Sequence, residues 1–191
     1  MITLKDFEIQ LPTGEKLFKP ININIQQGAI LVVTGPNGAG KSTFLNHLAK
    51  NACKENQIRL SPHQICYLPQ KYGHDFNFPF TLRDALYQPH LKQENSQQYQ
   101  ILKTLNLNRS WRTASGGERK KTLLLRCLLQ EPELIMMDEP FNHLDQNSRE
   151  IFLADLSHFL NLHPQTVIIL ITHDDLSQFL MNRNVQYLDL H

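Results

Sequence analysis

The chain has 191 residues, of which 41% are hydrophobic and 19% are charged, and its net charge is +1. This length and composition are typical of one soluble globular domain with a sizeable core, and they exclude a disordered chain. The small net charge gives no reason to expect nucleic acid as a partner, and we expect no membrane-spanning helix, because no apolar run reaches about 18 residues.

The N-terminal part predicts a small antiparallel sheet. Thr3–Gln10 and Ile21–Ile25 alternate apolar with polar residues, and proline and glycine residues punctuate the chain between and beside them. Alternation with a period of two is typical of a strand that has one buried face. We expect these strands to form an antiparallel β part, about residues 1–30, attached to the main core.

Four short apolar runs predict the strands of a parallel sheet. They are Ile30–Val33, Ile65–Leu68, Leu134–Met137 and Val167–Ile171. Each run is continuous, which is the pattern of strands covered by helices on both faces. Helical patterns begin after Lys41 and occupy about residues 118–130 and 148–160. Strands that alternate with helices indicate an α/β fold within a single domain that spans residues 1–191.

A helical lobe is predicted between the second and third runs. Residues 71–114 are rich in glutamine and asparagine and contain no strong strand pattern. We expect a short, mostly helical subdomain, about residues 71–130 with the helix that follows, inserted in the α/β core. An irregular surface excursion is the alternative. Thr81 and Asp84 have the spacing of a capping box, which predicts that a helix begins there.

The segment GPNGAGKS, from Gly35 to Ser42, fits the pattern G-x-x-x-x-G-K-[ST] between a predicted strand and a predicted helix. Its glycines permit a tight turn that brings backbone N–H groups close to phosphates, and a helix N-terminus stabilises anions. Lys41 would bring a positive charge to the β- and γ-phosphates, and Ser42 would offer its hydroxyl to Mg²⁺. The predicted nucleotide-binding residues of this P-loop are Gly35, Pro36, Asn37, Gly38, Ala39, Gly40, Lys41, Ser42 and Thr43.

Two carboxylates follow the third apolar run. Asp138 and Glu139 stand at the carboxyl end of a predicted buried strand, the edge of an α/β sheet where ligands bind. We expect Asp138 to hold Mg²⁺, directly or through water. Glu139 would lie beside the γ-phosphate and orient or deprotonate an attacking water.

The segment Ser115-Gly116-Gly117-Glu118-Arg119 resembles the signature of the ABC ATPase family, commonly written LSGGQ, and lies about 20 residues before the two carboxylates. Ala114 and Glu118 replace the usual Leu and Gln, whereas Ser115, Gly116 and Gly117 are unchanged. The residues themselves predict a capped helix start, with Ser115 as the N-cap and Glu118 completing a capping box.

The resemblance extends over nearly the whole chain and implies further roles. Gln70 matches a glutamine whose loop senses the nucleotide and its Mg²⁺ and contacts a membrane partner. Asp145 matches a loop that crosses a dimer interface. His173 matches a histidine that contacts the γ-phosphate, to which an imidazole can donate. The implied catalytic residues are Glu139, His173, Gln70 and Lys41, and the implied Mg²⁺ site comprises Ser42, Gln70 and Asp138.

The resemblance also implies an ATPase that works as a head-to-tail dimer. Two copies, or this chain and a homologous subunit, would sandwich two ATP molecules with Mg²⁺, and Ser115–Glu118 of one subunit would face the ATP of the other. Integral membrane permease subunits would be the further partners, which places the chain in the cytoplasm, peripherally on the membrane. Residues 75–84 resemble a stretch in manganese and zinc importers, which suggests a metal cation as cargo.

An alternative remains open at this point. Phe141–Asp145 resembles a segment of soluble ABC ATPases that act in translation or repair without a membrane partner. The residue that contacts adenine is also undecided between Leu11 and another residue such as Phe18. Two further expectations are structural: the basic run Arg112, Arg119, Lys120 and Lys121 forms a solvated helix face, and Cys53, Cys66 and Cys127 are reduced thiols.

Overall fold

The computed structural model describes residues 2–10, 13–51, 60–61, 64–70, 80–86 and 93–190. Its strands are β1 (Ile2–Phe7), β2 (Ile21–Ile25), β3 (Ile30–Thr34), β4 (Ile65–Leu68), β5 (Leu134–Asp138), β6 (Val167–Ile171) and β7 (Val185–Asp189). Its α-helices are α1 (Lys41–Asn51), α2 (Leu82–Leu86), α3 (Gln100–Lys103), α4 (Gly116–Leu129), α5 (Gln146–Leu162) and α6 (Ser177–Leu180), and two 3₁₀ helices are η2 (Gln93–Gln98) and η3 (Trp111–Thr113).

The central sheet has five strands in the order β4-β5-β6-β3-β7. All four neighbouring pairs run parallel, which confirms the predicted α/β fold. β5 and β6 are buried at every position, as their continuous apolar runs predict. β4 instead alternates between buried and half-buried residues, because it lies at one end of the strand order.

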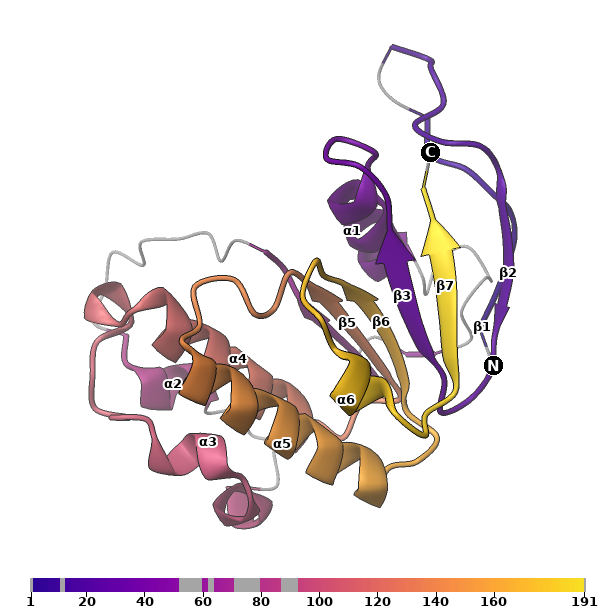
Figure 1. Ribbon diagram of the computed structural model, residues 1–191. Coiled ribbons are helices and arrows are strands. Elements are labelled where there is room, and N and C mark those ends of the chain that lie inside the picture. The colour runs from indigo at the N-terminus through magenta and orange to yellow at the C-terminus, as the bar shows by residue number, and fades with distance from the viewer. Residues whose placement is uncertain are drawn as a thin grey trace.

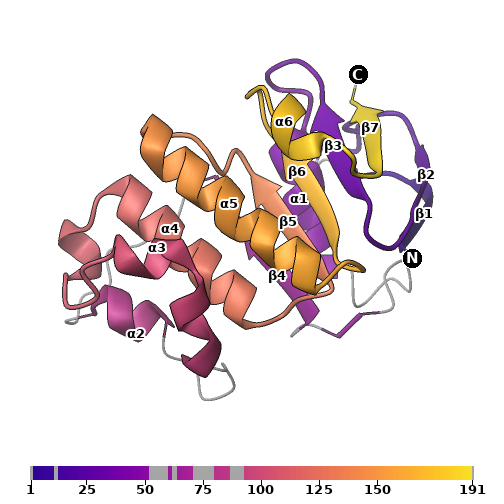
Figure 2. The same cartoon turned by 60° about the horizontal axis from the view of Figure 1, so that its bottom comes forward.

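Two cores cover the two faces of this sheet. On one face, α4 and α5 pack against alternate residues of the strands, such as Ile135 and Ile168. On the other face, α1 packs against the intervening residues, together with the hairpin β1–β2. Figures 1 and 2 show α4 and α5 on the side of the short helices α2 and α3, with α1 across the sheet from them. The fold therefore has three layers.

The strands β1 and β2 pair antiparallel, as predicted, and form a separate two-stranded sheet. β1 is shorter than the predicted strand Thr3–Gln10. Its register shifts between Leu4 and Phe7, where Asp6 has a φ of 48°, and Gln10 pairs only through an isolated bridge. The left-handed residue coincides with this break in the register, and the ladder ends at Phe7 because its partner, Ile21, is the first residue of β2.

Beside α4 lies a group of short helices: α2, η2, α3 and η3. The predicted capping box is present, since the Thr81 backbone N–H donates to Asp84 at 2.7 Å and the Asp84 N–H donates to the Thr81 hydroxyl at 3.2 Å. Asp155 of α5 accepts from the N–H groups of Gln100 and Ile101, which fixes the start of α3. Within the described part of residues 80–114, these short helices alternate with turns, and Thr81 pairs with Ser110 through an isolated antiparallel bridge.

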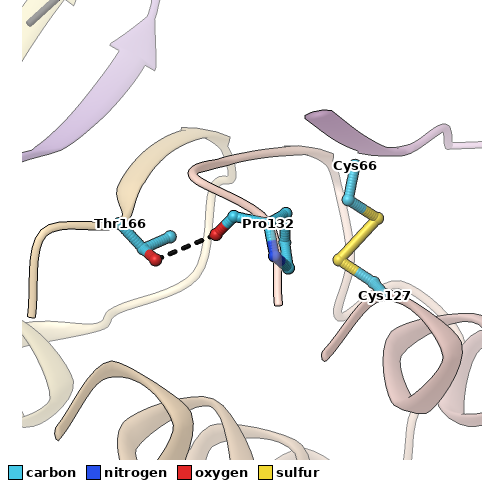
Figure 3. Close-up of a disulfide and its surroundings, with 4 residues drawn as sticks. All are labelled: Cys66, Cys127, Pro132 and Thr166. Carbon is cyan, nitrogen blue, oxygen red and sulfur yellow. Dashed lines mark hydrogen bonds between the residues drawn. A yellow bond between two sulfur atoms is a disulfide. The ribbon is translucent and has the colours of Figure 1, made fainter. Parts of the chain in front are cut away.

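A disulfide joins Cys66 of β4 to Cys127 of α4 (Figure 3). The expectation of reduced thiols is wrong for this pair. The two residues are 61 positions apart in sequence, but the packing of α4 on β4 places their Cα atoms 5.8 Å apart, a separation that a disulfide spans. Cys53 lies outside the described residues. Among the described helices, none is both long and apolar enough to cross a bilayer.

Candidate nucleotide site

The P-loop connects β3 to α1 in a conformation that requires glycine. Gly35 has a φ of 135°, and a Cβ there would lie 2.5 Å from the Leu190 carbonyl oxygen. Gly40 has a φ of 87°, and a Cβ there would lie 2.6 Å from the Leu17 side chain. Any larger residue would therefore be strained and would collide with a neighbour at both positions.

Lys41 begins α1 and is 8% exposed. Its ammonium donates to the carbonyl oxygens of Gly35 at 2.8 Å and Pro36 at 3.0 Å, so the side chain folds back along the loop. The unpaired N–H groups of a helix start carry partial positive charge, which the lysine reinforces. This arrangement can bind a phosphate chain.

Asp138 ends β5 and is 2% exposed, beside the Ser42 side chain. Burial raises the pKa of Asp138 above its ordinary value, although a hydrogen bond from Ser42 and the positive charges of Lys41 and Lys120 oppose the rise. Its Oδ1 atom is buried and accepts no hydrogen bond from the described residues. An orphaned buried carboxylate oxygen is unusual in a folded protein and points to a bound cation or donor.

The residues around Asp138 fit Mg²⁺. This ion prefers oxygen ligands and commonly uses one or two protein oxygens together with phosphates and water. The orphaned oxygen of Asp138 and the neighbouring Ser42 hydroxyl are such ligands. Gln70, the third residue of the implied Mg²⁺ site, lines the same pocket.

Glu139 follows at the strand end, in a left-handed conformation with a φ of 47°. Burial raises the pKa of its carboxyl group; His173 opposes this rise and Asp138 adds to it. The His173 Nε2 atom lies 3.4 Å from Glu139 Oε1. The parallel pairing of β5 with β6 explains this proximity, because the carboxyl ends of both strands meet at one edge.

A pocket of about 300 Å³ collects most of the predicted residues. It is lined by Asn37, Gly38, Gly40, Lys41, Ser42, Thr43, Gln70, Asp138, Glu139, Ile171 and His173. A larger cavity, of about 510 Å³, is lined by residues at the opposite, N-terminal ends of β5 and β6, such as Glu133 and Val167. It contains no part of the P-loop, so the smaller pocket is the candidate site.

The signature segment stands apart from this pocket, whose lining includes none of Ser115–Glu118. Ser115 caps α4: its hydroxyl accepts from the Glu118 N–H at 3.1 Å, and its own N–H donates to the Glu118 carboxylate at 2.8 Å. The predicted capping box is therefore present. Burial tends to raise the pKa of Glu118, but hydrogen bonds from Ser115 and Arg109 outweigh it and lower the pKa.

Asp145 is the N-cap of α5. Its carboxylate accepts from the Ser148 backbone N–H at 2.7 Å and from the Ser148 hydroxyl at 3.1 Å. These hydrogen bonds lower the pKa of Asp145. The residue thus has a structural role in this chain, in addition to the interface role that the resemblance implies.

Three cationic residues close to the site were not predicted. Lys120 and Lys121 are 3% and 8% exposed, so the interpretation of this basic run as a solvated helix face is wrong for both. They lie on the face of α4 that packs onto the segment after β5. Arg149 of α5 pairs with Asp174 at 3.0 Å and donates to the Asp175 carbonyl at 2.7 Å, which fixes the loop that carries His173.

Of the two candidates for the adenine contact, the structure describes only Phe18. Phe18 is 5% exposed and packs against the rings of Phe7 and Phe44, so it belongs to the core. Leu11 lies outside the described residues, as does the first half, residues 75–79, of the segment 75–84 that resembles metal importers.

The chain is similar to known proteins over most of its length. The family model for ABC transporters matches residues 18–142. Two relatives named zinc import ATP-binding protein ZnuC, from Wigglesworthia glossinidia brevipalpis and Psychrobacter arcticus, are 33% and 34% identical to it. Each alignment covers 84% of this chain, and they cover 71% and 68% of the two relatives, respectively.

Solved structures share the fold. The dimeric structure of a bacterial ABC transporter cassette matches with a TM-score of 0.74 at 22% identity, covering 99% of this chain and 94% of that one. An ATP-binding subunit of an ABC transporter matches with a TM-score of 0.77 at 20% identity, covering 100% and 86%. Together with the family match, the P-loop and the signature segment, these similarities establish that the chain belongs to the ABC transporter family, of which it is an ATP-binding cassette and ATPase domain.

Proposed function

We propose that this domain binds ATP with Mg²⁺ and hydrolyses it across a head-to-tail dimer, as the nucleotide-binding subunit of a transporter. One observation carries the proposal: a single pocket gathers Lys41, Asp138, Glu139 and His173, whereas Ser115–Gly117 begin a different helix outside its lining. A second copy, or a homologous subunit, would supply its own Ser115–Gly117 to the exposed side of the phosphates. Neither subunit alone would complete a site.

Each residue of the pocket has a chemical task in this mechanism. Lys41 and the N–H groups at the start of α1 bind the β- and γ-phosphates, and Ser42, Asp138 and Gln70 hold Mg²⁺. The ion, when bound, neutralises charge that develops on the phosphate oxygens. Glu139 orients the attacking water and accepts its proton. His173, 3.4 Å from Glu139, donates to a γ-phosphate oxygen.

Hydrolysis would drive a change in association. ATP contacts both subunits only when they are closed, so its binding energy favours the dimer. After loss of the γ-phosphate those contacts disappear, and the dimer opens. A membrane partner whose conformation changes as the dimer closes and opens would use the free energy of ATP hydrolysis for transport. Two copies of one chain would form an isologous interface with two equivalent sites.

Import of a metal cation is the transport reaction that we propose. The relatives from Wigglesworthia glossinidia brevipalpis and Psychrobacter arcticus carry the name of a zinc import ATP-binding protein and are 33% and 34% identical to this chain. Integral membrane permease subunits would bind the domain on the cytoplasmic face. The cation is the cargo of those partners and does not occupy the nucleotide pocket.

The hydrolytic part is tested with Glu139→Gln. This change keeps the size of the side chain but removes the proton acceptor, so we expect turnover to fall at least 100-fold, within the range typical of a lost general base, while ATP affinity is retained. ATP should then trap a dimer, measured by size-exclusion chromatography with light scattering. Lys41→Ala is the contrasting variant and should weaken ATP binding itself. Turnover like that of the unmodified protein in Glu139→Gln would refute the assignment.

The transport part needs a separate experiment. The tagged domain is purified from detergent-solubilised membranes, and the proteins that accompany it are identified by mass spectrometry. We expect integral membrane subunits at a fixed ratio, with uptake of radioactive zinc lost in the Glu139→Gln strain. Recovery with ribosomes or repair proteins, and no membrane subunit, would favour the soluble ABC ATPase instead.

A further inference from the structure

Two lysines of α4, Lys120 and Lys121, are buried, and both donate hydrogen bonds to residues that follow β5. A lysine is almost never fully buried unless its ammonium is paired or hydrogen-bonded. Lys120 is 3% exposed, and its Nζ atom donates to the backbone carbonyl oxygen of Glu139 at 2.7 Å. Burial lowers the pKa of Lys120, and the carboxylates of Glu139, Asp138 and Asp174 oppose this. The ammonium is thus placed against the catalytic end of β5.

The carbonyl that Lys120 holds belongs to a strained turn. Glu139 adopts a φ of 47°, a conformation that residues other than glycine adopt rarely and at a cost of about 1–2 kcal/mol. Its N–H donates to the Ile171 carbonyl of β6 at 2.9 Å, and its carbonyl accepts from the Asn142 N–H at 3.4 Å and from Lys120. Such a conformation persists only where the surroundings impose it from several sides. β6 imposes it from one side and α4 from the other.

The same helix contacts the segment that follows this turn. A Cβ on Gly117 would lie 3.3 Å from the Leu144 side chain, so α4 and the loop are in close contact at the helix start. One turn further, Lys121 donates to the Ser148 hydroxyl at 3.4 Å, and Ser148 in turn donates to Asp145. Consecutive lysines therefore attach both ends of the segment 139–148 to α4.

We propose that Lys120 is a positioning residue for hydrolysis: its ammonium fixes the turn at Glu139 to the helix that bears Ser115–Gly117, so that the catalytic carboxylate and the signature move as one body. This inference rests on the proposed function, in which Glu139 acts on the ATP of its own subunit and Ser115–Gly117 contact the ATP of the other. Closure of one site would then be transmitted through α4 to the glutamate of the other.

The test compares three variants of the purified full chain. Lys120→Met keeps most of the aliphatic stem and removes the ammonium, whereas Lys120→Gln retains an N–H donor without charge. Lys103→Met, at an exposed lysine of α3, is the matched control. We expect kcat to fall about 10- to 100-fold in Lys120→Met, the range for a small misplacement of a catalytic group, with partial recovery in Lys120→Gln. The KM for ATP should change less than about twofold, because the contacts that bind ATP equally in the ground state and the transition state are unaffected.

A second measurement separates positioning from folding. In the Glu139→Gln background, ATP should still trap the dimer when Lys120→Met is added, because the lysine acts on the hydrolytic step and not on closure. A kcat for Lys120→Met equal to that of Lys103→Met would overturn the inference. It would also be overturned if the whole decrease in kcat were explained by a fraction of the protein that no longer binds ATP. If Lys120→Met does not fold, Lys120→Gln is judged by the same criteria. Absence of ATPase activity in the unmodified protein would instead refute the proposed function.

Discussion

In the folded protein, burial raises the pKa of the Glu139 carboxyl group, and the neighbouring Asp138 carboxylate adds to the rise that His173 opposes. The folded state therefore retains the proton at a pH where the unfolded chain, with a pKa of about 4.3, has lost it. By linkage, the free energy of unfolding decreases as the pH rises from the unfolded pKa through the folded one. Above that window, the ionised glutamate destabilises the nucleotide-free domain.

This decrease in the free energy of unfolding with rising pH gives a prediction for the nucleotide-free domain. Glu139→Gln should raise the Tm at neutral pH by a few degrees, because it removes a buried charge. Residues that are needed for activity often lower the stability of the folded state in this way. The Tm of Glu139→Gln should also change less with pH than that of the unmodified protein. Calorimetry between pH 4 and 8 measures both, with Glu150→Gln, an exposed carboxylate of α5, as the control. An equal rise in the control would show that burial of Glu139 is not the cause.

At the start of α4, the side chain of Ser115 has a structural role and a proposed functional role. Ser115 accepts from the Glu118 N–H and so stabilises the helix, and we propose that the same residue faces the partner's phosphates. Two substitutions separate these roles. Ser115→Ala removes the acceptor and should reduce the free energy of unfolding by about 1 kcal/mol. Ser115→Asp keeps an acceptor at the N-cap but places a negative charge where a phosphate would bind.

We therefore expect opposite orders in two assays. In urea unfolding, Ser115→Asp should resemble the unmodified protein and Ser115→Ala should be the weaker of the two variants. In ATP-dependent dimerisation, Ser115→Asp should fail and Ser115→Ala should retain part of the activity. Dimerisation of Ser115→Asp at the normal ATP concentration would contradict the placement of this residue at the partner's phosphates.

The elements of this fold were predictable because their patterns are local. Continuous apolar runs gave β3, β4, β5 and β6, and the recurring apolar residues gave α1, α4 and α5. The prediction of a solvated face is wrong for the two buried lysines of α4, because it rested on their charge alone. Their spacing held a signal: Lys120 and Lys121 stand four residues before Leu124 and Leu125, which are fully buried, and residues at i and i+4 share a helix face.

At the scale of the whole molecule, the sequence could not predict the order of the strands in the central sheet. The rule that ligands bind at the carboxyl ends of parallel strands predicted the position of Asp138 and Glu139, which line one pocket with the P-loop and with His173, the residue that the family resemblance assigned. It could not show that β6 lies between β3 and β5, which brings His173 to within 3.4 Å of Glu139. That order depends on how the layers pack, and so do the contacts of Lys120 and Arg149 with neighbouring loops.

The disulfide between Cys66 and Cys127 connects β4, which leads to Gln70, with α4, which begins with the signature. Such bonds are rare in the reducing cytosol, where the proposed function places this domain. The redox state of the pair therefore depends on the conditions, and the bond adds stability when present. A link between residues 61 apart reduces the entropy of the unfolded chain and typically contributes about 2–4 kcal/mol.

We expect a reductant to lower the Tm of the oxidised protein by at least several degrees, since about 1 kcal/mol corresponds to roughly 2–4 °C in a domain of this size. The double variant Cys66→Ala with Cys127→Ala is the control, and its Tm should not respond to the reductant. Alkylation after denaturation, without reductant, should leave both residues unmodified, because a disulfide presents no thiolate to the reagent. If mass spectrometry finds both alkylated and the Tm is the same with and without reductant, the pair consists of two thiols in contact. The link between β4 and α4 would then depend on packing alone.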